Sequence, residues 1–130
     1  MAPPLKKILC IDDEDDILQV ATLALEQIGG FEVSSCNSGK AGLEYVCKMP
    51  PDLILLDAMM PHMDGPSTLK ELRKNPETGI IPVIFMTARV QPEQIQEYIA
   101  IGAVGVITKP FDPMTLSKDI ALLWEKLHGA

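Results

Sequence analysis

The sequence predicts an α/β fold in which a five-stranded parallel sheet carries helices on both faces. Two observations lead to this prediction. Five short apolar runs alternate with five stretches whose apolar residues recur at helical spacing. The connections between them are short, which is typical of doubly wound sheets with right-handed crossovers. The 130 residues are enough to bury one full core, so we expect a single domain over residues 1–130.

The predicted strands are short apolar runs that close on polar residues. Residues Leu53–Leu56 form an apolar run too short for a helix, and we expect this strand to be buried on both faces. Residues Phe31–Cys36 alternate in polarity, which favours a half-exposed strand at an edge of the sheet. The strands are predicted at Lys6–Asp12, Phe31–Cys36, Leu53–Leu56, Ile80–Thr87 and Ala103–Thr108.

Caps, prolines and glycines delimit the predicted helices. The first has an apolar face that includes Leu18, Leu25 and Ile28, and Gly29 ends it. The helices are predicted at about Asp15–Gln27, from a cap at Asn37 or Ser38 to Lys48, at Pro66–Lys74, from Pro92 to just before Gly102, and from Pro113, capped by Asp112, to His128.

The composition narrows the class of protein. Hydrophobic residues make up 47% of the chain and the net charge is −7. An acidic domain repels nucleic acid and anionic membranes, so we expect neither as a direct partner. No apolar run approaches the ~18 residues of a membrane span. The cysteines Cys10, Cys36 and Cys47 have no metal-ligand spacing and are expected to be small core residues in a reducing compartment, the cytoplasm.

Polar residues stand at the carboxyl ends of four predicted strands. Asp12 and Asp13 close the first and Asp57 follows the third. Thr87 ends the fourth and Lys109 follows the fifth. Each residue alone is typical of an ordinary strand end. Because the carboxyl ends of parallel strands meet at one edge, where ligands bind in open α/β sheets, their coincidence predicts a functional site.

The chemistry of this set favours phosphoryl transfer. Three carboxylates at close range repel one another, and each pair ~4 Å apart costs about 4 kcal/mol at an effective dielectric of 20. A raised pKa on one carboxyl or a bound hard cation offsets this repulsion. Oxygen ligands without His or Cys favour Mg²⁺ or Mn²⁺. With the ammonium of Lys109 and the hydroxyl of Thr87, the set suits the transfer of a phosphoryl group to Asp57.

The motifs around these residues resemble those of the receiver domain of two-component response regulators, over essentially the whole chain. The resemblance implies a flavodoxin-like (βα)5 fold with strand order 2-1-3-4-5. It implies a signalling switch whose chemistry is limited to its own phosphorylation and dephosphorylation. The matching motifs are Asp12–Asp13, DAMMPHMDG starting at Asp57, Met86–Thr87–Ala88 and Lys109–Pro110–Phe111.

The resemblance also implies a phosphoryl donor and a metal site. Asp57 would accept the group from a phosphohistidine on a sensor histidine kinase or a histidine phosphotransfer protein. The side chains of Asp13 and Asp57 and the backbone carbonyl of Met59 would bind Mg²⁺. Asp12 would assist through a water molecule.

Further residues would hold the phosphoryl group and pass on the signal. The resemblance implies that Thr87, Ala88 and Lys109 serve the phosphoryl group, and that the Lys109–Pro110 peptide is cis. Phosphorylation would change the face formed by the fourth helix, the fifth strand and the fifth helix, where an unidentified downstream protein would bind. The domain would be a monomer or a phosphorylation-dependent dimer, either complete by itself or part of a larger regulator.

One position departs from the family pattern. A Tyr or Phe often stands two residues before the last Thr of the fifth strand, and here that position is Val106. A β-branched side chain has few rotamers and no ring to reorient. We therefore expect the signal to depend on the loop Ala88–Gln91 and the fourth helix. Met59 and Arg89 occupy the variable positions that the family uses to tune the lifetime of the phosphoryl group.

Some apolar residues are candidates for a partner or dimer face. Tyr98 and Ile101 lie one turn apart and are expected to form an exposed spot. Trp124 is a further candidate, although core packing is the simpler interpretation. His62 is expected to be an exposed loop residue.

Two other classes of function remain as alternatives. A Mg²⁺-dependent phosphatase of the haloacid dehalogenase kind also uses an Asp nucleophile at a strand end. It needs a second acid two residues later, where this chain has Met59. A flavin-binding electron carrier has a similar topology but would leave the set of Asp12, Asp57 and Lys109 without a role.

Overall fold

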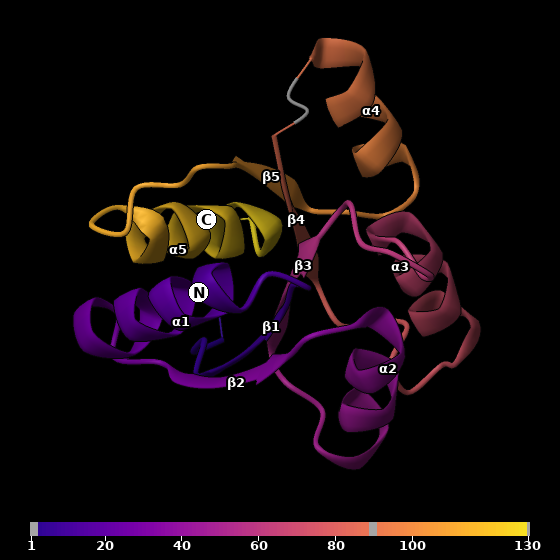
Figure 1. Cartoon of the computed structure of the whole chain (residues 1–130), viewed down its shortest axis with the longest axis horizontal. Helices are drawn as coiled ribbons and strands as arrows, with labels where there is room; N and C mark the ends of the chain where they lie inside the picture. The colour runs from indigo at the N-terminus through magenta and orange to yellow at the C-terminus, as the bar shows by residue number, and fades with distance from the viewer. Residues whose placement is uncertain (1–2, 89–90, 130) are drawn as a thin grey trace.

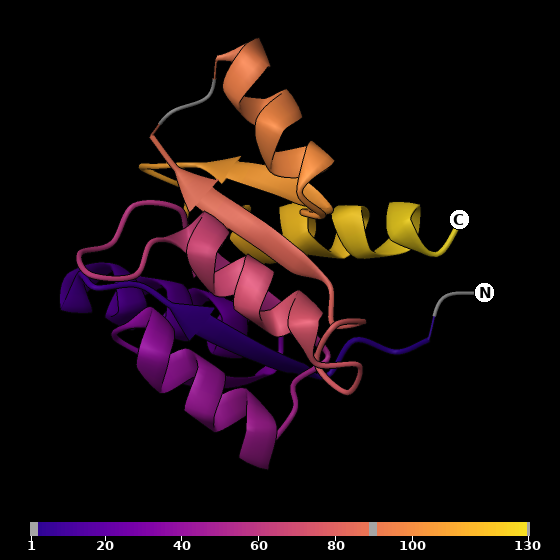
Figure 2. The same cartoon turned by 90° about the vertical axis from the view of Figure 1, so that its right-hand side faces the viewer.

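The computed structural model describes residues 3–88 and 91–129. Within these residues the strands form one parallel sheet in the order β2-β1-β3-β4-β5, which confirms the predicted topology and places β2 at an edge. Their arrows all point toward one side of the molecule (Figure 2). The strands are β1 (Lys7–Ile11), β2 (Glu32–Cys36), β3 (Leu53–Asp57), β4 (Val83–Thr87) and β5 (Gly105–Thr108).

Helices cover both faces of the sheet. The first ends in a π-helical turn, in which the amide of Gly29 donates to the carbonyl of Ala24. The helical segments are α1 (Asp15–Leu23), the π-helical turn η1 (Ala24–Ile28), α2 (Gly39–Lys48), α3 (Gly65–Lys74), α4 (Pro92–Ala100) and α5 (Leu116–Leu127). In Figure 1, α1 and α5 lie on one side of the sheet, and α2, α3 and α4 lie on the other.

The core has two halves because successive strand residues point to opposite faces. Leu53 and Leu55 pack toward α1 and α5, whereas Ile54 and Leu56 pack toward α2, α3 and α4. Every residue of β3 is buried, as predicted from its apolar run. No described helix is long and apolar enough to cross a membrane.

Several predicted boundaries are wrong for local reasons. The fifth helix begins at Leu116 rather than Pro113, because Asp112 closes a turn instead: its carboxylate accepts from the amide of Met114 at 2.8 Å, and its carbonyl accepts from Thr115. The fourth strand begins at Val83, after Pro82, which has no amide to enter the ladder. The predicted cap of the second helix is Ser38, whose hydroxyl accepts from the amide of Ala41.

Some side chains lie elsewhere than their patterns suggested. Tyr98 is buried against Phe85, so the predicted exposed spot with Ile101 does not form around its ring. Ile28, assigned to the apolar face of the first helix, is exposed at the end of the π-helical turn. Trp124 is a core residue, and its indole N–H donates to the carbonyl of Pro3 at 2.7 Å.

The cysteines do not share one environment. Cys10 is buried in β1, Cys36 is half-buried and Cys47 is exposed, so the expectation of three core residues is wrong for Cys47. Burial, together with the charge of Asp12, raises the pKa of the Cys10 thiol to about 12. Cys10 is therefore protonated and behaves as a small apolar side chain.

Candidate functional site

The strand ends bring the predicted polar residues to one edge of the sheet. Asp57 is the last residue of β3 and Thr87 the last of β4, whereas Asp12 directly follows β1 and Lys109 directly follows β5. The backbone amide of Lys109 donates to the carbonyl of Thr87 at 2.9 Å, which joins the ends of β4 and β5. Segments nearly a hundred residues apart thus meet at one place.

Lys109 lies among the carboxylates of this edge. Its Nζ is 2.8 Å from Oδ2 of Asp12, 3.3 Å from Oδ2 of Asp57 and 3.4 Å from Oε1 of Glu14. Asp12 and Asp57 are 1% and 2% exposed, so their contacts with Lys109 are largely shielded from solvent, whereas the Glu14 side chain is exposed. A cation in this position holds the two buried carboxylates together.

Backbone amides fix one oxygen of each buried carboxylate. Oδ1 of Asp12 accepts from the amide of Glu14 at 2.9 Å, and Oδ1 of Asp57 accepts from the amide of Met59 at 3.1 Å. The Oδ2 atoms of both carboxylates are buried and have no hydrogen bond of good geometry within the described part of the chain, although both contact the Lys109 ammonium. Two anionic oxygens are thus available to a further ligand.

Burial makes Asp57 an unusual acid. It raises the pKa of the Asp57 carboxyl to about 7, an effect that the Met59 amide and Lys109 oppose and the charge of Asp12 strengthens. Burial also disfavours the charge of Lys109, but the contact and charge of Asp12, followed by those of Asp57, outweigh it and raise the pKa of Lys109. The site therefore has a fixed cation beside an acid that titrates near neutral pH.

The acidic residues at this edge also form a candidate metal centre. Asp12, Asp13, Glu14 and Asp57 each offer a carboxylate oxygen, and these oxygens lie within 4.8 Å of one another. An all-oxygen set suits a hard divalent cation such as Mg²⁺ or Mn²⁺, and the two buried oxygens without hydrogen bonds fit such a ligand. The residues present are thus suitable for the metal that the sequence predicted.

Sequence reasoning left Glu14 out of the site. Glu14 directly precedes α1, and its side chain reaches Lys109 and the other carboxylates. Its place in the acidic run from Asp12 to Asp16 was the available signal. The run alone did not separate Glu14, which turns toward the site, from Asp15 and Asp16, which are exposed at the start of α1.

The remaining predicted residues surround this cluster. Ala88 is exposed directly after β4, and Val106 is half-buried in β5, in register with Phe85. The Lys109–Pro110 peptide is cis. Arg89 lies outside the described residues, as does part of the predicted signalling loop.

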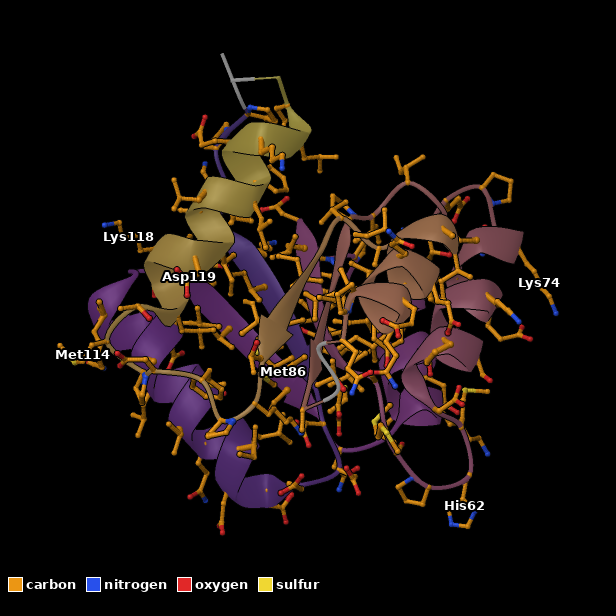
Figure 3. The ribbon with its side chains drawn as sticks, turned by 90° about the horizontal axis from the view of Figure 1, so that it is seen from above. His62, Lys74, Met86, Met114, Lys118 and Asp119 are labelled. Atoms are coloured by element: carbon orange, nitrogen blue, oxygen red, sulfur yellow. The ribbon has the colours of Figure 1, made fainter. Side chains whose placement is uncertain are left out.

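The loop after Asp57 forms one side of the site. Met59 is 53% exposed, and its neighbour Met60 is buried. A hollow of about 160 Å³ lies between this loop, Asp13 and the start of α2. Figure 3 shows His62 at the tip of the loop, pointing away from the molecule, whereas Met86 lies in the middle of the sheet. The exposed position predicted for His62 is confirmed.

The family of this chain follows from a comparison with family models. Residues 8–121 match the model of the response regulator receiver domain. The chain belongs to this family. It is a receiver domain of a two-component response regulator, and the matched residues include the ends of β1, β3, β4 and β5.

The receiver domain is similar to parts of larger proteins. It is 39% identical over 108 residues to the regulatory protein AtoC of Escherichia coli, covering 83% of this chain and 23% of that protein. It is 38% identical over 121 residues to a Vibrio cholerae protein named "Probable cyclic di-GMP phosphodiesterase", covering 93% of this chain and 25% of that protein. The chain thus spans about a quarter of the length of these relatives.

Solved structures include domains of the same size and fold. The chemotaxis response regulator CheY4 of Vibrio cholerae is 33% identical, with a TM-score of 0.85, and the match covers 92% of this chain and 99% of that one. The receiver fold is that of a signalling switch, and its members work with histidine kinases or phosphotransfer proteins. The alternative function, a phosphatase of the haloacid dehalogenase kind, is not favoured. Met59 occupies the position where such a phosphatase needs a second acid.

Proposed function

We propose that this receiver domain is a phosphoacceptor switch in which Asp57 takes a phosphoryl group from a phosphohistidine of a histidine kinase or phosphotransfer protein. A carboxylate oxygen of Asp57 attacks the phosphorus in line. The P–O bond forms as the P–N bond breaks, and the imidazole leaves with the electron pair. The observation that carries the proposal is the contact of Lys109 with both buried carboxylates, Asp12 and Asp57.

The neighbouring groups neutralise the transferred phosphoryl oxygens. Lys109 is held within reach of Asp57 by its ion pairs, and Thr87 ends the adjacent strand. We assign the phosphoryl oxygens to the Lys109 ammonium, the Thr87 hydroxyl and the backbone after Thr87 at Ala88. A fixed cation whose pKa is raised keeps its proton, so it stabilises charge throughout the transfer.

The acidic groups clustered around Asp57 would hold the metal. Asp13, Asp57 and the backbone carbonyl of Met59 would bind Mg²⁺, and Asp12 would assist through water. When bound, the metal supplies a positive charge against the phosphoryl oxygens. Glu14 completes the acidic set and also contacts Lys109, so it orients the lysine.

We further propose that the added charge alters the face formed by α4, β5 and α5, where a downstream protein binds. A hollow of about 510 Å³ between β5 and α5, lined by Val106, Phe111 and Leu122, lies on this face. Leu122 is exposed on it, which suits contact with a partner.

The test is phosphorylation with a small donor. Acetyl phosphate with Mg²⁺ should add one phosphoryl group to the wild type, observed by intact mass, and none to Asp57→Asn. Asp52 is half-buried just before β3, at the end opposite to the strand ends that form the site, so Asp52→Asn serves as the control and should still be modified. Undiminished modification of Asp57→Asn would refute the assignment.

A further inference from the structure

One side chain anchors α4. Tyr98 is the only buried residue among the nine of this helix, all of which the structure describes. Figure 1 shows α4 at the end of its helical layer, beyond α3. The packing of α4 on the domain therefore depends strongly on how the Tyr98 ring is placed.

The Tyr98 ring is linked to Asp57 by a short series of packed groups. It lies 4.8 Å from the ring of Phe85, centroid to centroid, at an angle of 53°. The Phe85 ring lies close to Gly65, where an added Cβ would be 2.8 Å from the ring and 2.6 Å from the carbonyl oxygen of Asp57. A shift of the backbone at Asp57 or Gly65 therefore reaches Phe85 and then Tyr98, because close-packed groups cannot absorb it.

Beside the ring there is room for a second position. A hollow of about 520 Å³ separates Tyr98 and Glu97 of α4 from Met59 and Met60 of the loop after β3. Met59 is joined to the site by the hydrogen bond from its amide to Asp57 Oδ1. Methionine side chains are flexible and adapt to a ring that enters such a space. The loop after β3 thus contacts the Asp57 carboxylate and also lines the hollow.

The neighbouring strand offers no competing ring. Val106 is in register with Phe85 and packs against the same half of the core. Its branched side chain has few allowed rotamers and no ring to reorient. Phe85 is fully buried in the middle of the sheet. Val106 borders a different hollow, between β5 and α5, whereas Tyr98 is the one that borders the hollow beside Met59 and Met60.

We propose that Tyr98 is the positioning residue through which phosphorylation of Asp57 moves α4, a proposal that rests on the function proposed above. The phosphoryl group takes up space at the Asp57 carboxylate and disturbs its hydrogen bond with the Met59 amide. The loop from Ala58 to Met60 moves and reshapes the hollow. The Tyr98 ring then leaves Phe85 for the hollow, and α4 follows.

The ring can be observed directly without a mutation at Tyr98. The chain has two tyrosines, Tyr45 and Tyr98, so 3-fluorotyrosine gives two ¹⁹F resonances, which Tyr45→Phe assigns. On addition of acetyl phosphate and Mg²⁺, with intact mass recording the phosphoryl group, the Tyr98 resonance should shift and the Tyr45 resonance should not. An unchanged Tyr98 resonance in the phosphorylated protein would overturn this proposal.

Variants test whether the ring transmits the signal. In Tyr98→Phe, which keeps the ring, phosphorylation should shift the backbone amide resonances of α4 as in the wild type. In Tyr98→Ala these shifts should be lost while Asp57 still gains one phosphoryl group. The matched control Tyr45→Ala, on α2, should retain them. Full α4 shifts in Tyr98→Ala would contradict the proposal.

The two proposals fail in distinguishable ways. If the mass shows no phosphoryl group on the wild type, the phosphoacceptor function is wrong and the role of Tyr98 falls with it. If the group is added but the Tyr98 ring does not respond, only the role of Tyr98 is wrong. Should Tyr98→Ala not fold, the ¹⁹F measurement on the wild type decides alone.

Discussion

The Asp57 carboxyl is 2% exposed and faces the carboxylate of Asp12, so ionising it in the free protein is costly. The Lys109 ammonium, 3.3 Å from Asp57, compensates only in part, because burial still raises the pKa of Asp57 to about 7. Positive charge added nearby therefore stabilises the ionised form of Asp57. A bound cation supplies such a charge, and so does the positively polarised phosphorus atom of a phosphoryl donor.

This conflict predicts a pH dependence of stability. The pKa of Asp57 rises from 3.8 to about 7 on folding. The contribution of this carboxyl to the free energy of unfolding is therefore present at low pH and is lost as pH rises through 7. In metal-free buffer, Asp57→Asn should therefore be more stable than the wild type at pH 8, by roughly 1–3 kcal/mol, with a smaller difference at pH 4.5. Urea unfolding measures both values.

Glu125 is exposed, and Glu125→Gln serves as the control. The difference in free energy of unfolding between this variant and the wild type should be small at both pH values. A variant Asp57→Asn that is less stable than the wild type at pH 8 would show that the ion pair with Lys109 outweighs the burial of Asp57.

Strand-end polarity allowed most of this cluster to be located from the sequence. Asp12, Asp13, Asp57 and Lys109 each follow or end an apolar run, and the parallel sheet brings them together. Glu14 could not be separated from its acidic neighbours, because its direction depends on the turn that precedes α1. The catalytic and metal-binding roles of these residues stay predictions.

At the scale of elements, the β3–α3 connection determines the shape of the site. Gly65, the first residue of α3, donates its amide to the carbonyl of Ala58 at 3.1 Å and packs against the Asp57 backbone. Asp64 caps α3 by accepting from the amide of Ser67 at 2.8 Å. The loop that carries Met59 is thereby closed tightly over the end of β3.

Gly65→Ala should disrupt the close packing of this loop against the end of β3. The new Cβ would lie 2.6 Å from the Asp57 carbonyl oxygen and 2.7 Å from Ala58 Cα, so the backbone must shift. We expect the free energy of unfolding to fall by about 1–3 kcal/mol, the usual cost of overpacking. Ser67→Ala, exposed in the same turn, should change it by less than about 0.5 kcal/mol. Equal stability of Gly65→Ala and the wild type would show that the contact is loose.

Element boundaries were harder to predict than element types. The turn that Asp112 closes delays the fifth helix by three residues relative to its proline, which a cap-and-proline pattern cannot indicate. The burial of Tyr98 depends on Phe85, a residue of β4, so helical spacing within α4 gave no sign of it. A local turn decided the first case, and a contact distant in the sequence decided the second.

At the scale of the molecule, the alternation of strands and helices was enough to predict a parallel sheet with helices on both faces, whereas the strand order came from the resemblance to receiver domains. The net charge of −7 and the acidic cluster at one edge also predict a global response to divalent cations. A ligand that binds the folded state alone stabilises it, by about 2.7 kcal/mol at a concentration 100 times its Kd. Mg²⁺ should therefore raise the free energy of unfolding of the wild type.

Replacing one acid of the cluster should remove this response. Asp13→Asn should show little stabilisation by Mg²⁺ in urea unfolding. The exposed helix residue Asp16 lies outside the cluster, so Asp16→Asn should respond like the wild type. Equal responses of Asp13→Asn and the wild type would place the metal elsewhere.

The claim on which the whole account depends is that the phosphoryl group resides on Asp57. Borohydride reduces an acyl phosphate to the alcohol, so treating the acetyl phosphate product with borohydride and sequencing its peptides by mass spectrometry locates the modified residue. The account predicts homoserine at position 57. Homoserine at Asp12 or Asp13 instead, or no modified carboxyl at all, would contradict it.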